Sequence, residues 1–338
     1  MKPFYSLLLL LSLSFAANSV ENVQAKSWLE RLSTSLRSLN FSTSFVVVKN
    51  NQAEPYHWLH GVNKEQVELE IIARLNGPRR DVLRKGEVVS YIEPEQEVYS
   101  IVAKSLTSPI PSVFSDNISV LEANYRFISV GRSRVLGRVA QLIRIVAKDE
   151  HRFGYWLWLD QQSGLLLKTA VITRQGQLLE QIQFTHLDIT DDIPENLMQL
   201  ESTQLPVVIE PAIDNKEVAL FWKINWLPEG FKAIKSNRHR IHQNKKAVEF
   251  MLFSDGLVDI SVYVNPSTKK QRPIEYASDG ATLVFSQIIN GLEVSVVGQI
   301  PLATAKLIAD SIAPTPNQDI SHLENISTNN VLVNKLGQ

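Results

Sequence analysis

The segment that decides the fold class of this chain is Val67-Glu68-Leu69-Glu70-Ile71-Ile72-Ala73-Arg74-Leu75-Asn76-Gly77-Pro78. Apolar side chains stand at every odd position from 67 to 75 and alternate with Glu68, Glu70 and Arg74. This is the period of a half-buried β-strand. Asn76-Gly77-Pro78 then ends the strand in a turn, and Lys85-Gly86 predicts the next hairpin turn. The spacing therefore predicts a meandering antiparallel sheet.

The period of two extends outward from this segment in both directions. It starts near Phe41 and continues to about Leu187. Further strands are predicted at Asp81–Arg84, Val88–Ile92, Glu97–Val102, Tyr125–Val130, Val139–Ala147, Tyr155–Asp160, Leu165–Thr173 and Leu178–Leu187. Ser108-Pro109-Ile110-Pro111 cannot lie in a central strand, because proline lacks the backbone donor that a strand ladder needs. We expect it to begin a short helix or a lid over the sheet.

The first residues have the pattern of an export signal. Lys2 precedes the Leu-rich stretch Ser6–Ala17, which is too short to span a bilayer comfortably. Cleavage is expected after Ala25, with Ala16 as the alternative, so the mature protein should lie outside the cytoplasm. An amphipathic helix should follow, because Ser27–Glu30 has the form of a capping box before an apolar stripe with helical spacing. The stripe consists of Trp28, Leu32, Leu36 and Leu39.

A second domain is predicted beyond a proline-bounded linker. Asp192, Pro194 and Glu195 predict a short helix just before it. In the second domain, strands are expected at Val248–Phe253, Val258–Val264, Ala281–Ile288 and Leu292–Val297, and a helix at Pro301–Ile312. The predicted organisation is a signal peptide (1–25), a first domain (26–203), a linker (204–212), a second domain (213–313) and a mobile tail (314–338). The fold class is α+β.

Composition excludes several classes of protein. The 338 residues are 44% apolar and 20% charged, which is typical of a folded globular protein. Lys and Arg number 34 against 35 Asp and Glu, so no overall positive field exists to attract nucleic acid. The absence of cysteine excludes disulfides, thiolate catalysis and Cys-ligated zinc. No segment after the signal is apolar enough to span a membrane.

Short catalytic and metal patterns fail on their context. Ser267-x-x-Lys270 and Ser115-Asp116-Asn117 match penicillin-binding motifs, but they occur in the wrong order and without Lys-Thr-Gly. His57-x-x-His60 and His239-x-x-His242 have a spacing that points two strand side chains to opposite faces. No nearby carboxylate completes either pair. The sequence therefore predicts no enzyme, no cofactor and no metal site.

Basic and aromatic clusters are more informative. Residues 132–152 contain Arg132, Arg134, Arg138, Arg144, Lys148 and Arg152 against two acids, and Lys232–Lys246 contains six cations and no acid. The latter is interpreted either as a solvated loop or as a patch for a phosphorylated lipid or an acidic peptide. The strand Tyr155–Asp160 directs Trp156 and Trp158 to one face and Tyr155, Leu157 and Leu159 to the other. Helices or a ligand cavity should cover its second face.

The chain resembles the periplasmic sigma-E regulatory proteins of the RseB/MucB family over nearly the whole mature length. The resemblance rests on residues 76–82, 90–94, 127–134, 144–149, 155–160, 226–231 and 254–257. Residues 157–165 also look like the strand-turn-strand of the lipoprotein carriers LolA and LolB. The resemblance implies an unclosed antiparallel β-barrel plugged by helices, followed by a smaller antiparallel sheet with helices.

The function implied by the resemblance is negative regulation of the envelope stress response in the periplasm. Such a protein binds the periplasmic region of the anti-sigma factor RseA/MucA and shields it from cleavage by the site-1 protease DegS. Lipopolysaccharide or the acyl chains of mislocalised lipoproteins release it. Homo-oligomers are possible. The alternative is a soluble periplasmic lipoprotein or lipid carrier of the LolA type.

Trp156 and Trp158 should line the lipid cavity, and Arg79, Arg80, Arg132 and Arg134 should contact lipid phosphates. Contacts with the partner are expected from Trp222, Trp226, Phe231, Arg238 and Arg240.

Overall fold

The computed structural model describes residues 22–94, 97–103, 110–209, 220–240, 247–267 and 275–315. The chain divides after residue 213 into two compact units, which are described separately. The predicted signal peptide falls almost entirely outside the described residues, as does the tail from residue 316 onward. Over the described part of the chain, no helix combines the length and the apolar composition needed to cross a bilayer.

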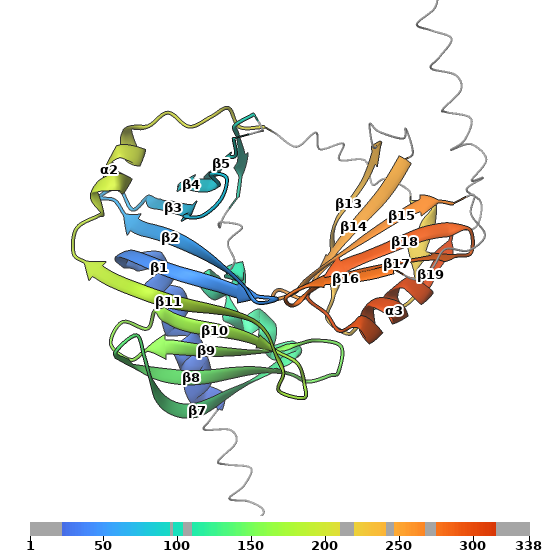
Figure 1. Cartoon of the computed structure of the whole chain (residues 1–338), viewed down its shortest axis with the longest axis horizontal. Helices are drawn as coiled ribbons and strands as arrows, with labels where there is room; N and C mark the ends of the chain where they lie inside the picture. The colour runs from blue at the N-terminus through green and yellow to red at the C-terminus, as the bar shows by residue number, and fades with distance from the viewer. Residues whose placement is uncertain are drawn as a thin grey trace, which may run out of the picture. The chain divides into compact units, whose positions relative to one another are not determined.

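The first unit is built on one open antiparallel sheet (Figure 1). Eleven strands are ordered within the described residues as β6 (Tyr99–Val102), β5 (Val88–Ile92), β4 (Asp81–Lys85), β3 (Glu68–Arg74), β2 (Gln52–Val62), β1 (Asn40–Lys49), β11 (Leu178–Thr190), β10 (Leu166–Ile172), β9 (Gly154–Asp160), β8 (Arg138–Ala147) and β7 (Tyr125–Val135). The predicted unclosed sheet is confirmed. The sequence period from Phe41 corresponds to the hairpin of β1 and β2, whose turn residues Asn50 and Asn51 both have positive φ.

The N-terminal helix (residues 22–38) packs on one face of this sheet, which we call the inner face (Figure 1). Ala25, Leu29, Leu32 and Leu36 are its buried apolar residues. Leu36 lines a small apolar gap together with Phe41, Trp58 and Phe184 of the sheet. The inner face is thus the face of Phe41 and Trp58, and the helix removes much of it from water.

The predicted start of this helix at Ser27 is wrong. The helix already includes residue 22, and the Ser27 hydroxyl donates to the carbonyl of Gln24 at 2.8 Å instead of capping Glu30. The buried stripe also shifts by one residue from Trp28 to Leu29. Trp28 is half-buried, with the Arg31 guanidinium 5.1 Å above its ring. Ala25 is fully buried in the helix, and the cleavage site after it stays a prediction.

Polar contacts fix the helix to the turn between β9 and β10. Arg31 donates to the carbonyls of Gln161 and Gln162, and Ser35 donates to that of Ser163 at 2.6 Å. Asp160 shapes this turn by accepting two hydrogen bonds from Ser163 and two from Arg138. Burial would raise the pKa of Asp160, but these donors outweigh it and hold the pKa below its usual value.

Short helices complete the first unit. Two 3-10 helices, η1 (Ser112–Ser115) and η2 (Ile118–Ala123), follow the proline-rich segment. The prediction of a short helix there is confirmed. Helix α2 (Glu195–Ser202) packs Leu197 and Leu200 against Leu59 and Leu69 on the outer face, opposite the inner one. The predicted cap at Asp192 is wrong, because the helix begins at Glu195 after Pro194 and has no side-chain cap.

The segment predicted as the linker is partly attached to the first sheet. Val208 forms a parallel bridge with Ser100 of the edge strand β6. The Ser100 amide donates to Val207, and the Ile209 amide donates back to Ser100 at 2.7 Å. The Ser100 hydroxyl donates to Pro206. Residues 206–209 therefore cover part of an otherwise open sheet edge.

The second unit contains a six-stranded antiparallel sheet within the described residues (Figure 1). Its order is β13 (Lys232–Arg240), β14 (Ala247–Ser254), β15 (Asp259–Pro266), β18 (Leu292–Gly298), β17 (Thr282–Ile289) and β16 (Glu275–Asp279). Helix α3 (Leu302–Asp310) packs on β17 and β18, and β12 (Trp222–Ile224) pairs with β19 (Ile312–Pro314). Phe285, Val296 and Ile308 lie in the fully buried core.

The prediction of a loop over Lys232–Lys246 is wrong for its first part. Residues 232–240 form the edge strand β13, whose pairing partner within the described residues is β14. Strand-like alternation is obscured there because Lys232, Ile234 and Lys235 are all exposed. Charged side chains are common on edge strands, where they discourage pairing with other chains. Residues 241–246 lie outside the described residues.

A glycine substitution tests the contact between helix and turn. Gly164 has a φ of +81°, and a Cβ there would approach Arg31 Cγ to 2.8 Å and Ser35 Oγ to 3.0 Å. Gly176 has a similar φ of +87° with nothing within 4 Å. We expect Gly164→Ala and Gly176→Ala each to lose about 1 kcal/mol from the left-handed backbone. Gly164→Ala should lose about 1–3 kcal/mol more through overpacking. Urea unfolding measures the difference; equal losses would contradict the docking of the helix on this turn.

Candidate functional site

Strand β9 separates its side chains between the two faces as predicted. Tyr155, Leu157 and Leu159 are buried on the inner face, whereas Trp156 and Trp158 are half-buried on the outer face. Among the described residues, neither helices nor a closed cavity cover these two rings. Their cross-strand neighbours do so, with the Arg144 guanidinium 5.3 Å from the Trp156 ring and the Lys168 ammonium 4.8 Å from the Trp158 ring. Cation–π attraction fixes both pairs.

The register of the sheet explains this arrangement. Arg144 of β8 stands directly opposite Trp156, and Lys168 of β10 stands directly opposite Trp158. Directly paired residues of an antiparallel sheet share a face, so each long cationic side chain lies along an indole. Burial lowers the pKa of Lys168. The outer face thus presents two neighbouring indole rings, with centroids 6.0 Å apart, each in contact with a cation from a different neighbouring strand.

A pocket of about 240 Å³ opens beside Trp156, and we call it the outer pocket. Its cationic lining residues come from β7, β8 and the loops beside β9 and β10: Arg126, Arg144, Lys148, Arg152 and Arg174. Arg144 Nε is buried without a hydrogen-bond partner among the described residues. Such a lining suits an anionic group attached to an apolar or aromatic body. Arg144, Lys148 and Arg152 belong to the basic cluster predicted at residues 132–152. The strand register is needed to show that they lie around Trp156.

Some of the cations in the outer pocket are already paired. Arg152 forms an ion pair with Asp149, and Lys148 donates to the carbonyls of Glu122 and Ala123. The pair of Arg174 with Glu150 is long, at 3.8 Å, and both side chains are largely exposed. Exposed pairs of this kind contribute little, so the Arg174 guanidinium can turn toward a ligand.

The arginines predicted to contact lipid phosphate do not form one cluster in the sheet order. Arg79 and Arg80 lie in the turn between β3 and β4, where they pair with Asp81 at 2.6 Å and Glu93 at 3.7 Å. Arg132 and Arg134 are exposed on the edge strand β7. The two pairs thus belong to opposite halves of the open sheet. Their role in lipid binding stays a prediction.

The residues predicted to contact the partner have different environments in the second unit. Trp222 and Phe231 are buried, whereas Trp226 is half-buried next to the end of α3. The carbonyl of Trp226 accepts from the Ser311 hydroxyl. Arg238 and Arg240 lie in β13, and the orientation of their side chains falls outside the described residues. Contact with a partner stays a prediction for all five.

The described members of the serine patterns do not form a catalytic group. Ser115 is the last residue of η1, Asp116 follows it, and the Asn117 side chain caps η2 by accepting from the Ser119 amide. Ser267 follows β15, where its amide donates to Gly291 at 2.8 Å. Lys270 lies outside the described residues. The described members of both patterns therefore serve turns and caps.

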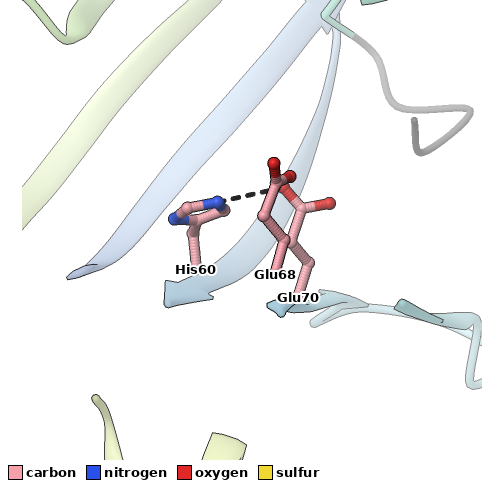
Figure 2. Close-up of side chains that lie close together, drawn as sticks. All are labelled: His60, Glu68 and Glu70. Carbon is pink, nitrogen blue, oxygen red and sulfur yellow. Dashed lines mark ion pairs between the residues drawn. The ribbon is translucent and has the colours of Figure 1, made fainter. Parts of the chain in front are cut away.

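One histidine lies in a polar cluster that sequence reasoning missed (Figure 2). His57 and His60 point to opposite faces of β2 as predicted, but β3 brings Glu68 and Glu70 beside His60 on the inner face. The ligand atoms of these three residues all lie within 4.8 Å of one another. The prediction that no nearby carboxylate completes the His57-x-x-His60 pair is therefore wrong for His60. Glu68 and Glu70 come from a neighbouring strand, which the local spacing around His60 does not reveal.

The cluster also contains one guanidinium. Arg84 Nη1 lies 2.6 Å from Glu68 Oε2 and 3.5 Å from Glu70 Oε2. Burial raises the pKa of Glu70 to about 7, although Arg84 acts in the opposite direction. Burial likewise lowers the pKa of His60. Among the described residues, His60, Glu68 and Glu70 are the group of His and Glu side chains that lies close enough together to hold a metal ion.

The raised pKa of Glu70 predicts a pH dependence of stability. The folded state retains a proton from about pH 4.5 to about pH 7 that the unfolded state releases, so the unfolding free energy should fall as pH rises through this window. The side chain of Glu70→Gln does not titrate. The unfolding free energy of this variant should therefore decrease by about 1–3 kcal/mol less than that of the wild type over the same pH window. Urea unfolding in EDTA at several pH values measures it. Glu65→Gln, at an exposed position, is the control; parallel curves for Glu70→Gln and wild type would contradict the assignment.

Comparison with known proteins gives the family. Residues 24–207 match the MucB/RseB N-terminal domain, and residues 216–313 match the MucB/RseB C-terminal domain. The sigma-E factor regulatory protein RseB of Salmonella typhimurium is 31% identical over 303 residues, which cover 89% of this chain and 94% of that protein.

Two solved structures are similar over most of the chain. The complex of MucA and MucB from Pseudomonas aeruginosa contains a chain that is 29% identical, with a TM-score of 0.70 over 86% of this chain and 99% of that one. A second structure, MucB in complex with MucA(peri), gives 30% identity and a TM-score of 0.68 over 86% of this chain and 98% of that one. The similar proteins are regulators, not enzymes. Because both domains match in order along the sequence, the chain belongs to the MucB/RseB family.

Proposed function

We propose that this chain is a periplasmic negative regulator of a sigma-E-type envelope stress response. It binds the periplasmic region of its anti-sigma factor and shields that region from site-1 cleavage. The observation that carries this proposal is the match to MucB in complex with MucA, at a TM-score of 0.70 over 86% of the chain. The predicted export signal supports a periplasmic location. The mechanism is occupancy, since a bound segment is unavailable to a protease.

The second unit offers a surface for an extended peptide. In the part of the chain that the structure describes, the edge strand β13 pairs on one side, and Lys232, Ile234 and Lys235 are exposed along it. An extended segment can add to such an edge through backbone hydrogen bonds, and lysines favour acidic residues in that segment. The half-buried Trp226 is the aromatic contact proposed for the same partner.

Release by an envelope amphiphile is the second part of the proposal. Lipopolysaccharide and misplaced lipoproteins combine acyl chains with polar headgroups, and those of lipopolysaccharide are anionic. The outer pocket offers cations around Trp156, and acyl burial contributes about 0.8 kcal/mol per CH₂ group. An amphiphile displaces the partner only if it binds the partner-free state more tightly.

Protection from proteolysis tests this function. The purified full-length mature protein is mixed with the anti-sigma periplasmic region and its site-1 protease, with and without lipopolysaccharide. We expect cleavage to slow when the protein is present and to recover when lipopolysaccharide is added. The protease acting on an unrelated substrate controls for direct inhibition. Unchanged cleavage would contradict the proposal, and transfer of acylated lipoprotein between membranes without protection would favour the carrier alternative.

Two double variants locate the amphiphile site. Arg126→Gln/Arg174→Gln removes two cations from the outer pocket, so we expect it to need about tenfold more lipopolysaccharide to release the partner. Arg79→Gln/Arg80→Gln removes two cations that already pair with Asp81 and Glu93, and it serves as the matched control. Release is measured by fluorescence anisotropy of a labelled anti-sigma peptide. A defect confined to Arg79→Gln/Arg80→Gln would place the phosphate contacts at the β3–β4 turn.

A further inference from the structure

The cluster around His60 contains an unsatisfied interaction that the regulatory function does not explain. His60 is fully buried, and its Nδ1 lies 2.7 Å from the carbonyl oxygen of Leu39. A carbonyl oxygen only accepts, so Nδ1 carries the proton and Nε2 of the neutral ring carries a lone pair. Nε2 has no hydrogen-bond partner among the described residues.

The lone pair of Nε2 faces another acceptor. Glu70 Oε1 lies 3.8 Å from Nε2, and Glu68 lies on the same side of the ring (Figure 2). Two acceptors in a dry environment repel each other unless a positive group lies between them. A proton on Glu70 is one such group, but 3.8 Å exceeds the length of a hydrogen bond.

A metal ion fits this separation better. With metal–nitrogen and metal–oxygen bonds of about 2.0–2.1 Å, a tetrahedral zinc ion places two ligand atoms about 3.4 Å apart. The His60 and Glu70 ligand atoms, 3.8 Å apart, are within a few tenths of an ångström of this value, and the Glu68 ligand atom, which lies within 4.8 Å of both, completes the site by moving toward them. A backbone carbonyl that accepts from the far nitrogen is the usual second-shell partner of a ligating histidine, and Leu39 supplies it.

Charge and access agree with a divalent cation. When both are ionised, Glu68 and Glu70 carry two negative charges, and the Arg84 guanidinium lies within ion-pair distance of both. Arg84 Nε is already held by the carbonyl of Gly86 at 2.8 Å, outside the cluster. The Glu68 side chain is 24% exposed, so an ion can enter from its side.

We propose that His60, Glu68 and Glu70 form a zinc-binding site on the inner face, with Arg84 as the internal cation that zinc displaces. The site is independent of the proposed regulatory function. Bound zinc joins β2 to β3 beside the end of the N-terminal helix, because Leu39 holds the histidine that ligates it. By linkage, zinc raises the thermal stability of the chain.

Calorimetric titration of the full-length, tag-free mature protein with ZnCl₂, after EDTA treatment and dialysis, tests the site. We expect one zinc ion per chain and a higher melting temperature. Glu70→Gln should weaken binding by more than about tenfold, because a ligand is lost. Arg84→Gln should strengthen binding by about tenfold, because a competing cation is lost. A variant that fails to fold would lose zinc binding, so tighter binding by Arg84→Gln cannot result from misfolding.

Control variants separate this site from surface histidines. His57→Gln lies on the same strand but on the outer face, so it should leave zinc binding unchanged. His239→Gln/His242→Gln removes the second His-x-x-His pair and should also have no effect. Cobalt(II) provides an independent readout, because a tetrahedral site gives visible absorption that Glu70→Gln should abolish. No binding by the wild type, or binding lost in His239→Gln/His242→Gln and retained in Glu70→Gln, would overturn the proposal.

Discussion

The fold depends on covering one apolar face of an open sheet. An eleven-stranded antiparallel sheet that does not close exposes the inner side chains of every strand unless something packs on them. The N-terminal helix does so with Leu29, Leu32 and Leu36, and Arg31 and Ser35 fix it to the β9–β10 turn. Apolar burial drives the docking, and these side-chain hydrogen bonds fix the position of the helix on the sheet.

The alternation of the strands then separates two kinds of chemistry. Inner residues such as Tyr155 and Leu157 form a core, whereas outer residues such as Trp156 and Arg144 remain partly accessible. The accessible groups are cations that lie against aromatic rings, which is a suitable surface for an anionic amphiphile. Binding at the outer face therefore leaves the packing of the inner face intact. This separation supports the proposed regulation by occupancy alone.

Local sequence signals predicted much of the fold and little of the site. Turn residues such as Gly86 and Gly291, combined with the period of two, located most strands. The start of the N-terminal helix was wrong because Ser27 and Glu30 imitate a cap inside a longer helix, and β13 was missed because its exposed lysines hide the alternation. The outer pocket and the His60 cluster depend on which residues face each other across strands. That register is set by the whole sheet and cannot be read from spacing along the chain.

In the proposed function, partner and amphiphile bind the chain with opposing preferences. Thermodynamic linkage requires the effect to be reciprocal, so the factor by which lipopolysaccharide weakens peptide binding must equal the factor by which the peptide weakens lipopolysaccharide binding. Calorimetric titration of each ligand, alone and in the presence of the other, measures both factors. We expect two equal factors well above one. Identical lipopolysaccharide affinity with and without the anti-sigma peptide would contradict it.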